Sequence, residues 1–129
     1  DVPMITGINH VQITVPRQAV EEAREFYCGV LGLPEIEKPD SLKPRGGFWV
    51  QVGGTQVHIS IEDGVNRLAT KAHIAYEVDD IVYWQQHLRA HGVETQESVP
   101  IPGCCRFEFR DPFGNRVEII QPMCDDRES

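Results

Sequence analysis

The strongest constraint on this chain is an internal repeat, because its two halves carry the same succession of segments. Residues 9–13 (NHVQI) open the first half, and residues 72–76 (AHIAY) open the second. Each half continues with a helical pattern that ends at a glycine and closes with a related strand pattern, at residues 54–59 (GTQVHI) and 114–119 (GNRVEI). One duplicated unit with small insertions explains this arrangement. The chain length of 129 residues fits one domain or two tightly fused half-domains.

Within each half, the hydrophobic periodicity predicts a strand, a helix and then three strands. In the first half we expect strands at 8–15, 34–38, 47–52 and 55–62, and a helix at 19–31 that ends at Gly32. In the second half we expect strands at 72–78, 93–98, 104–110 and 115–121, and a helix at 80–91, capped by Asp79 or Asp80 and ended by Gly92. The predicted class is α+β, with mixed sheets covered by helices on one side.

Charge and cysteine content indicate which binding partners and which cellular compartment to expect. The chain has 20 acidic and 12 basic residues and a net charge of −8, so we expect neither nucleic acid nor a membrane surface as a partner. Four cysteines without C-x-x-C spacing predict unpaired thiols in a reducing, cytoplasmic location. Residues 1–4 are interpreted as a leftover of expression or the start of the chain, and residues 123–129 as a tail.

Four side chains on the polar rows of the strands suggest a metal site. Alternation places the apolar rows against the helices and leaves His10, His58, His73 and Glu118 on the opposite faces, at equivalent positions of the repeat. If the halves meet about a pseudo-twofold axis, these four side chains converge. Three imidazoles and one carboxylate suit one divalent ion of Zn, Ni, Co, Mn or Fe. His10, His73 and Glu118 alone would form a 2-His-1-carboxylate triad with open positions.

The sequence resembles the vicinal oxygen chelate superfamily over residues 5–122. This superfamily contains glyoxalase I, extradiol dioxygenases, methylmalonyl-CoA epimerase, fosfomycin-resistance enzymes and bleomycin-binding proteins. The motifs that carry the resemblance are residues 8–11 (INHV), Phe26-Tyr27 leading to 30–33 (VLGL), 72–75 (AHIA) and 110–118 (RDPFGNRVE). The resemblance implies two tandem βαβββ half-modules, at 5–63 and 70–122, that form a mixed-sheet cup around the metal.

The resemblance also implies a function and a ligand set. The family's metal positions fall on His10, His58, His73 and Glu118, and a homodimer is the usual assembly. We expect a metal-dependent lyase or isomerase of glyoxalase type, which chelates vicinal oxygens of a small substrate. The alternatives are an extradiol-type dioxygenase and a non-catalytic protein that binds a drug or metabolite. His58 is either the fourth ligand or an acid/base group beside the metal.

Four further residues are candidates for the same site. Glu77 lies two residues beyond His73 on the same row and is a candidate general base. Arg106 and Glu108 share a row, and Arg106 is a candidate clamp for a substrate carboxylate. Trp49 is a candidate pocket residue. The competing interpretations are a solvated Glu77, a rim ion pair for Arg106 and Glu108, and core packing for Trp49.

Overall fold

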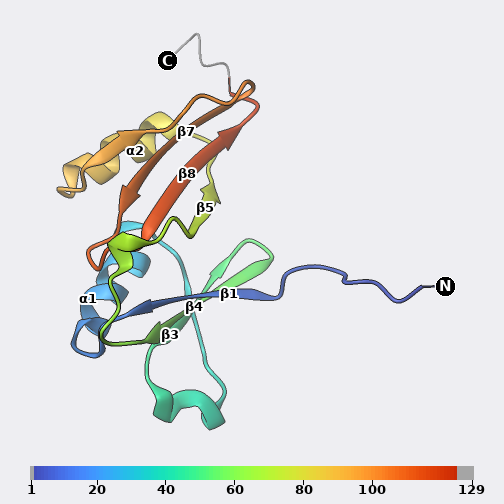
Figure 1. Ribbon diagram of the computed structural model, residues 1–129, viewed down its shortest axis with the longest axis vertical. Coiled ribbons are helices and arrows are strands. Elements are labelled where there is room, and N and C mark those ends of the chain that lie inside the picture. The colour runs from blue at the N-terminus through green and yellow to red at the C-terminus, as the bar shows by residue number, and fades with distance from the viewer. Residues whose placement is uncertain (1, 125–129) are drawn as a thin grey trace. The chain divides into compact units, whose positions relative to one another are not determined.

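The computed structural model describes residues 2–124, and the chain forms two compact units, Asp1–Val65 and Asn66–Ser129. The expected tail from residue 123 therefore lies mostly outside the described residues, as does Asp1. Residues 2–9 precede the first strand without regular secondary structure. Figure 1 shows this segment as an extended trace ahead of β1.

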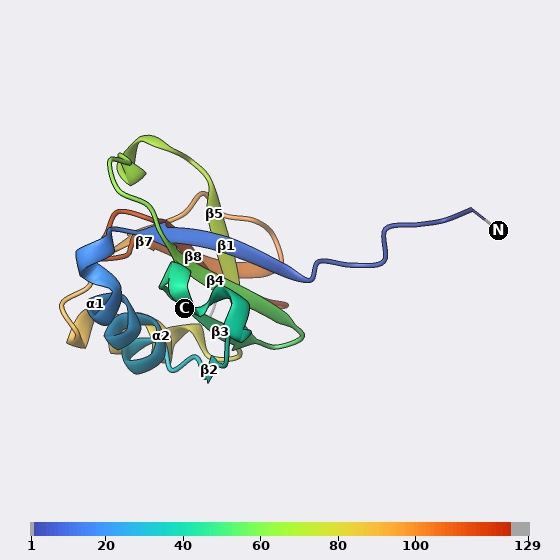
Figure 2. The same cartoon turned by 90° about the horizontal axis from the view of Figure 1, so that it is seen from below.

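Unit 1 contains one four-stranded mixed sheet. Its strands are β1 (His10–Val15), β2 (Glu35–Ile36), β3 (Phe48–Val52) and β4 (Thr55–Ile61). They are ordered β1-β4-β3-β2, with β1 parallel to β4 and the other neighbours antiparallel. Figure 2 shows β1 and β4 running alongside each other. A tight hairpin can join only antiparallel strands, so the parallel pair of β1 and β4 needs a longer crossover connection, which here runs through the helical segment, β2 and β3.

Unit 2 repeats this topology. Its strands are β5 (His73–Glu77), β6 (Thr95–Glu97), β7 (Cys104–Arg110) and β8 (Arg116–Pro122). They are ordered β5-β8-β7-β6, again with one parallel pair, β5 and β8. The predicted α+β class and the tandem βαβββ half-modules are confirmed. The edge strands β2 and β6 are shorter than expected, because only two or three residues of each pair with a neighbour.

The helical segment of unit 1 is one continuous stretch of three geometries. A 3₁₀ turn η1 (Arg17–Ala19) leads into α1 (Val20–Arg24), which continues as the π-helical turn η2 (Glu25–Val30). The wider turn is marked by the bond from the Leu31 amide to the Phe26 carbonyl, 2.9 Å long. The helical segment ends at Val30 with Leu31 as its C-cap, and Gly32 follows at φ +70° in the C′ position where the sequence predicted it.

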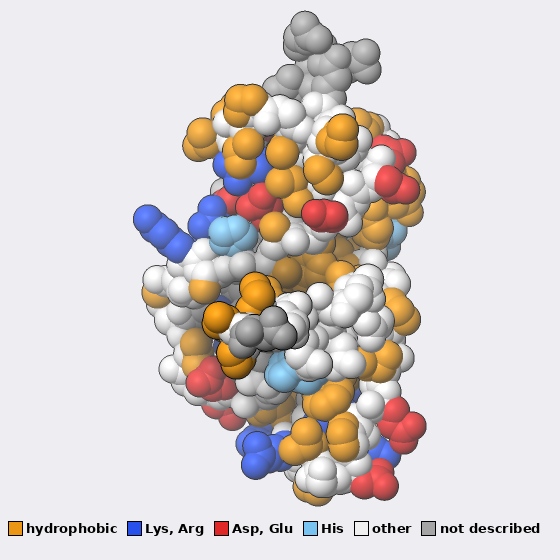
Figure 3. All heavy atoms as spheres, turned by 90° about the vertical axis from the view of Figure 1, so that its right-hand side faces the viewer, with side chains coloured by type: hydrophobic (Ala, Val, Ile, Leu, Met, Phe, Trp, Pro, Cys, Tyr) orange, Lys and Arg blue, Asp and Glu red, His pale blue; other side chains and the backbone are white. Residues whose placement is uncertain are grey.

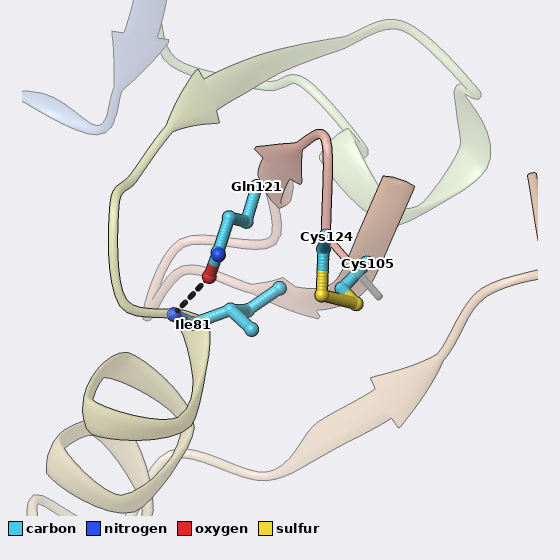
Figure 4. The surroundings of a disulfide bond; sticks show 4 residues. All are labelled: Ile81, Cys105, Gln121 and Cys124. Atoms are coloured by element: carbon cyan, nitrogen blue, oxygen red, sulfur yellow. Dashed lines mark hydrogen bonds between the residues drawn. A yellow bond between two sulfur atoms is a disulfide. The ribbon is translucent and has the colours of Figure 1, made fainter. Parts of the chain in front are cut away.

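The helix of unit 2, α2 (Ile81–Ala90), has a well-defined start. The Asp80 side chain accepts a 3.1 Å hydrogen bond from the Tyr83 amide, so Asp80 is the N-cap. The Ile81 amide donates to Gln121 Oε1 at 2.9 Å, which ties the first turn to β8 (Figure 4). Gly92 follows the helix at φ +78° and completes its C-terminus.

Each unit buries its own apolar face. In unit 1, the apolar row of β4 and the helical stripe provide the core, with Val57, Ile59, Ala23, Phe26 and Tyr27 all buried. Arg24 Cζ lies 4.9 Å from the centroid of the Phe48 ring, so α1 also contacts β3. In unit 2 the buried apolar residues are Tyr76, Leu88, Phe107, Phe109, Val117 and Ile119.

The expectation of four unpaired thiols is wrong for two of them. Cys105 and Cys124 form a disulfide with their Cα atoms 5.5 Å apart, whereas Cys28 and Cys104 are free (Figure 4). The antiparallel register puts Cys105 opposite Gln121, and the chain then turns back through Met123 at φ +60°. This return is what brings Cys124 to Cys105, and no local spacing signals it. The pairing also removes the cysteine argument for a reducing compartment.

One face of the protein carries charge of both signs. On the face drawn in Figure 3, acidic and basic side chains are interspersed with hydrophobic ones. Within residues 2–124, no helix is long and apolar enough to cross a membrane.

Candidate functional site

In unit 1, the two candidate imidazoles lie next to each other on the polar face of the sheet. The rings of His10 and His58 stack with centroids 4.0 Å apart and an interplanar angle of 13°. The ring of Trp49 covers the other side of His58, with centroids 3.7 Å apart. His58 is therefore buried, with 5% of its surface exposed, while His10 is exposed.

Hydrogen bonds determine which ring nitrogen of His10 and of His58 carries the proton. His10 Nδ1 lies 2.9 Å from Asn9 Oδ1 and donates to it, which leaves Nε2 of His10 as an acceptor. His58 Nε2 lies 3.0 Å from Gln56 Oε1 and donates to that amide oxygen. Burial, together with the nearby His10 and Lys38, holds the pKa of His58 below its usual range.

In unit 2, the corresponding pair is an imidazole and a carboxylate. His73 Nε2 lies 3.1 Å from Glu118 Oε1, and His73 Nδ1 lies 3.0 Å from the Lys71 carbonyl oxygen. Glu118 is buried, with 5% exposure, and also accepts from Arg106 Nη1 at 3.3 Å. Both ring nitrogens of His73 thus face an acceptor. A neutral imidazole has one N–H and can donate to only one of them.

The sheet register makes the two pairs equivalent. His10 pairs with Gln56, two residues before His58 on β4, and His73 pairs with Arg116, two residues before Glu118 on β8. Each candidate pair therefore spans the parallel strands of its unit on the same diagonal and on one face. Among residues 2–124, no group of three or more His, Cys, Asp or Glu side chains lies together as a metal cluster.

The other four candidates from the sequence have different surroundings. Trp49 joins the site of unit 1 through its stacking on His58. Arg106 contacts Glu118 and also donates from Nε to the Val99 carbonyl at 3.0 Å, so its guanidinium is already engaged. Glu108 forms an ion pair with Arg116, 2.7 Å between Oε2 and Nη2, whereas Glu77 is exposed at the end of β5. The ion pair of Glu108 therefore forms with Arg116, its diagonal neighbour on β8.

A pocket of about 450 Å³ adjoins the imidazole stack of unit 1. It is lined by Gln12, Lys38, Arg45, Trp49, His58 and Ser60, among others. Sequence reasoning missed Lys38 and Arg45. Lys38 was expected at the end of a strand, whereas β2 ends at Ile36, and Arg45 ends a 3₁₀ turn for which the sequence predicted no element. The prolines and glycines around that segment, Pro39 and Gly46-Gly47, indicate a turn and no more.

Three comparisons with known proteins agree on the family. The model of the Glyoxalase/Bleomycin resistance protein/Dioxygenase superfamily matches residues 7–119. A solved structure described as a glyoxalase family protein from Bacillus anthracis is 40% identical, covers 95% of this chain and 99% of its own, and has a TM-score of 0.87. "Glyoxylase I 4" of Arabidopsis thaliana is 26% identical over 94% of this chain and 72% of its own length.

The fold is shared more widely. The fosfomycin resistance protein FosX from Listeria monocytogenes, solved with Mn(II) and sulfate, has a TM-score of 0.75 at 20% identity and covers 96% of each chain. At that identity the likeness shows the fold alone. Because the family model spans most of the chain and the Bacillus protein matches it almost end to end, this chain belongs to the Glyoxalase/Bleomycin resistance protein/Dioxygenase superfamily.

Proposed function

We propose that the protein is a metal-dependent enzyme of the glyoxalase type that acts on a small oxygenated substrate as a lyase or isomerase. The observation that carries the proposal is the position of His73 between two acceptors, Lys71 O and Glu118 Oε1. With Nδ1 donating to the carbonyl, a divalent cation bound to Nε2 and Glu118 would satisfy both groups without an extra proton.

The donor set fits such an ion. His10 has the same arrangement as His73, with Nδ1 engaged and Nε2 available as a ligand atom. His10, His73 and Glu118 would hold the metal, contributed by the two half-modules of one chain or of two chains in a homodimer. When bound, the ion would act as a Lewis acid toward neighbouring substrate oxygens. Arg106 and the Lys71 carbonyl would orient Glu118 and His73.

For His58 the geometry supports a position beside the metal. An imidazole nitrogen binds a metal ion that lies in the plane of the ring. The stacked rings of His10 and His58 are nearly parallel, so one ion cannot lie in both ring planes. His58 Nε2 is also occupied by Gln56. As a neutral imidazole close to the site, His58 would move a proton to or from the substrate. Its role as the fourth ligand stays an alternative, and the metal content of His58→Gln separates the two.

The test is metal content after exhaustive dialysis and reloading. We expect about one divalent ion per chain in the wild type, as in other sites with an open coordination position, and its loss in Glu118→Ala. Glu97→Ala, which removes an exposed carboxylate from β6, is the control and should keep the ion. Failure to take up Zn, Ni, Co, Mn or Fe would overturn the proposal. Turnover with Fe and oxygen uptake on catechols would favour the dioxygenase instead.

A non-catalytic binding protein is the second candidate. It is favoured by the aromatic stack and the pocket of unit 1, which exist without any contribution from the metal ligands of unit 2. This function predicts stoichiometric ligand binding that survives Glu118→Ala, with no turnover.

Sedimentation at several protein concentrations would test the expected homodimer in the same preparations.

A further inference from the structure

The pocket of unit 1 is positively charged in a chain that is acidic overall. Its lining contains Lys38, Arg45 and the two imidazoles, and none of its lining residues in the described part of the chain carries a carboxylate. The chain as a whole has a net charge of −8. Cationic side chains that line one pocket without acidic neighbours attract anions to it.

The two cations lack the partners that a neighbouring lysine has. Lys43, in the same segment, forms ion pairs with Glu37 at 3.1 Å and Asp40 at 2.8 Å. Within residues 2–124, neither Lys38 nor Arg45 forms an ion pair with a carboxylate; Lys38 Nζ donates to the Gly46 carbonyl. Lys38 is half-buried, so its charge is only partly solvated. The pocket therefore contains two cations that can still bind an anion.

The wall that carries these cations is held in place by the backbone. The 3₁₀ segment η3 (Asp40–Arg45) is closed by bonds from the Leu42 amide to the Pro39 carbonyl, 2.9 Å, and from the Gly46 amide to the Lys43 carbonyl, 3.1 Å. Gly47 follows at φ +79°, and a Cβ there would lie 2.2 Å from the Ile59 carbonyl oxygen. Only glycine permits this approach to β4, so the wall is preorganised.

We propose that Lys38 and Arg45 bind the anionic group of the substrate, a carboxylate or a phosphoryl-type oxyanion, in this pocket. The inference deepens the proposed function, because it assigns a substrate class to the site beside His58. Lys38 would contribute a point charge, and the guanidinium of Arg45 a planar pair of donors. A substrate with an anionic group would thereby be directed toward the imidazole stack.

The test uses metal-free protein, so that it is independent of the metal proposal. Trp84→Phe leaves Trp49, which lines the pocket, as the sole tryptophan reporter. Its fluorescence is followed during titration with inorganic phosphate in one series and acetate in another, at constant chloride. We expect a saturable change in at least one series, and that series identifies the preferred anion. In Lys38→Gln and Arg45→Gln the affinity should fall about tenfold each, as expected for loss of a charge-assisted hydrogen bond.

The control is Lys43→Gln, which removes an equal charge from the same segment outside the pocket. It should leave the affinity unchanged, and circular dichroism confirms that each variant is folded. No saturable change in either series, or equal loss in Lys43→Gln, would overturn the inference. Anion binding without metal uptake would refute the metalloenzyme proposal alone, and metal uptake without anion binding would refute the pocket assignment alone.

Discussion

Trp49 and His58 are directly opposite each other on β3 and β4, and their rings stack with centroids 3.7 Å apart and an interplanar angle of 1°. With His10 on the other side, His58 is enclosed between two rings from different strands. Strand pairing thus determines the orientation of the His58 imidazole, since rotation of this ring would open gaps beside Trp49 and His10.

Replacing Trp49 should reveal the contribution of this stack. We expect Trp49→Leu to lower the free energy of unfolding by about 1 kcal/mol more than Trp49→Phe, which keeps an aromatic face on His58. Urea unfolding followed by circular dichroism measures both variants. Equal losses would show that the imidazole needs no aromatic neighbour.

Protonation of His58 should oppose folding. Its folded pKa lies below the usual value of 6.5, so between those two values the unfolded chain binds more protons. The free energy of unfolding therefore rises with pH in this window and falls as the pH drops below about 6.5. The titratable or charged groups beside the ring are His10 and Lys38, and Arg45 lines the same pocket.

The measurement is urea unfolding of wild type and His58→Gln from about pH 7.5 to about pH 5. Because every other titratable group is present in both proteins, the difference between the two curves isolates His58. We expect the wild type to lose stability relative to the variant toward low pH. Parallel curves would contradict the assignment of a lowered pKa.

Arg106 should stabilise unit 2 through Glu118. The side chains of both are mostly buried, with 18% and 7% exposed, and Arg106 Nη1 lies 3.3 Å from Glu118 Oε1. We expect Arg106→Met to lower the free energy of unfolding by about 2–4 kcal/mol, because it leaves a buried carboxylate with one partner fewer. The double variant Arg106→Met, Glu118→Gln should regain part of this loss. Additive losses would show that the pair does not interact.

The Cys105–Cys124 bond should hold the end of β8 to β7. It closes a segment of 19 residues, so Cys124→Ser should lower the free energy of unfolding by about 3 kcal/mol under non-reducing conditions. Cys104→Ser is the matched control, since its thiol is free. Thiol titration of the unfolded, unreduced chain should give two reactive groups per chain, and four after reduction. Four before reduction would contradict the bond.

Much of the fold could be predicted from local patterns. Period-two alternation located β7 and β8 to within a residue, and the glycines at 32 and 92 ended both helical segments where expected. The repeat predicted that His10 and His73 occupy equivalent positions, and the register confirms it. Alternation and helix ends depend on neighbours a few residues apart, and the repeat is visible in the sequence itself, so a single sequence is sufficient to determine these features.

The tertiary structure alone decided which distant groups meet. The Glu108–Arg116 pair and the Cys105–Cys124 bond each depend on backbone paths through turns that have no periodicity. The same holds for Lys38 and Arg45, which reach the pocket only because Gly46 and Gly47 turn the segment onto β4. The sequence thus determined which donors lie on which strand face, while the folded turns determined what surrounds them, because those contacts join residues far apart along the chain.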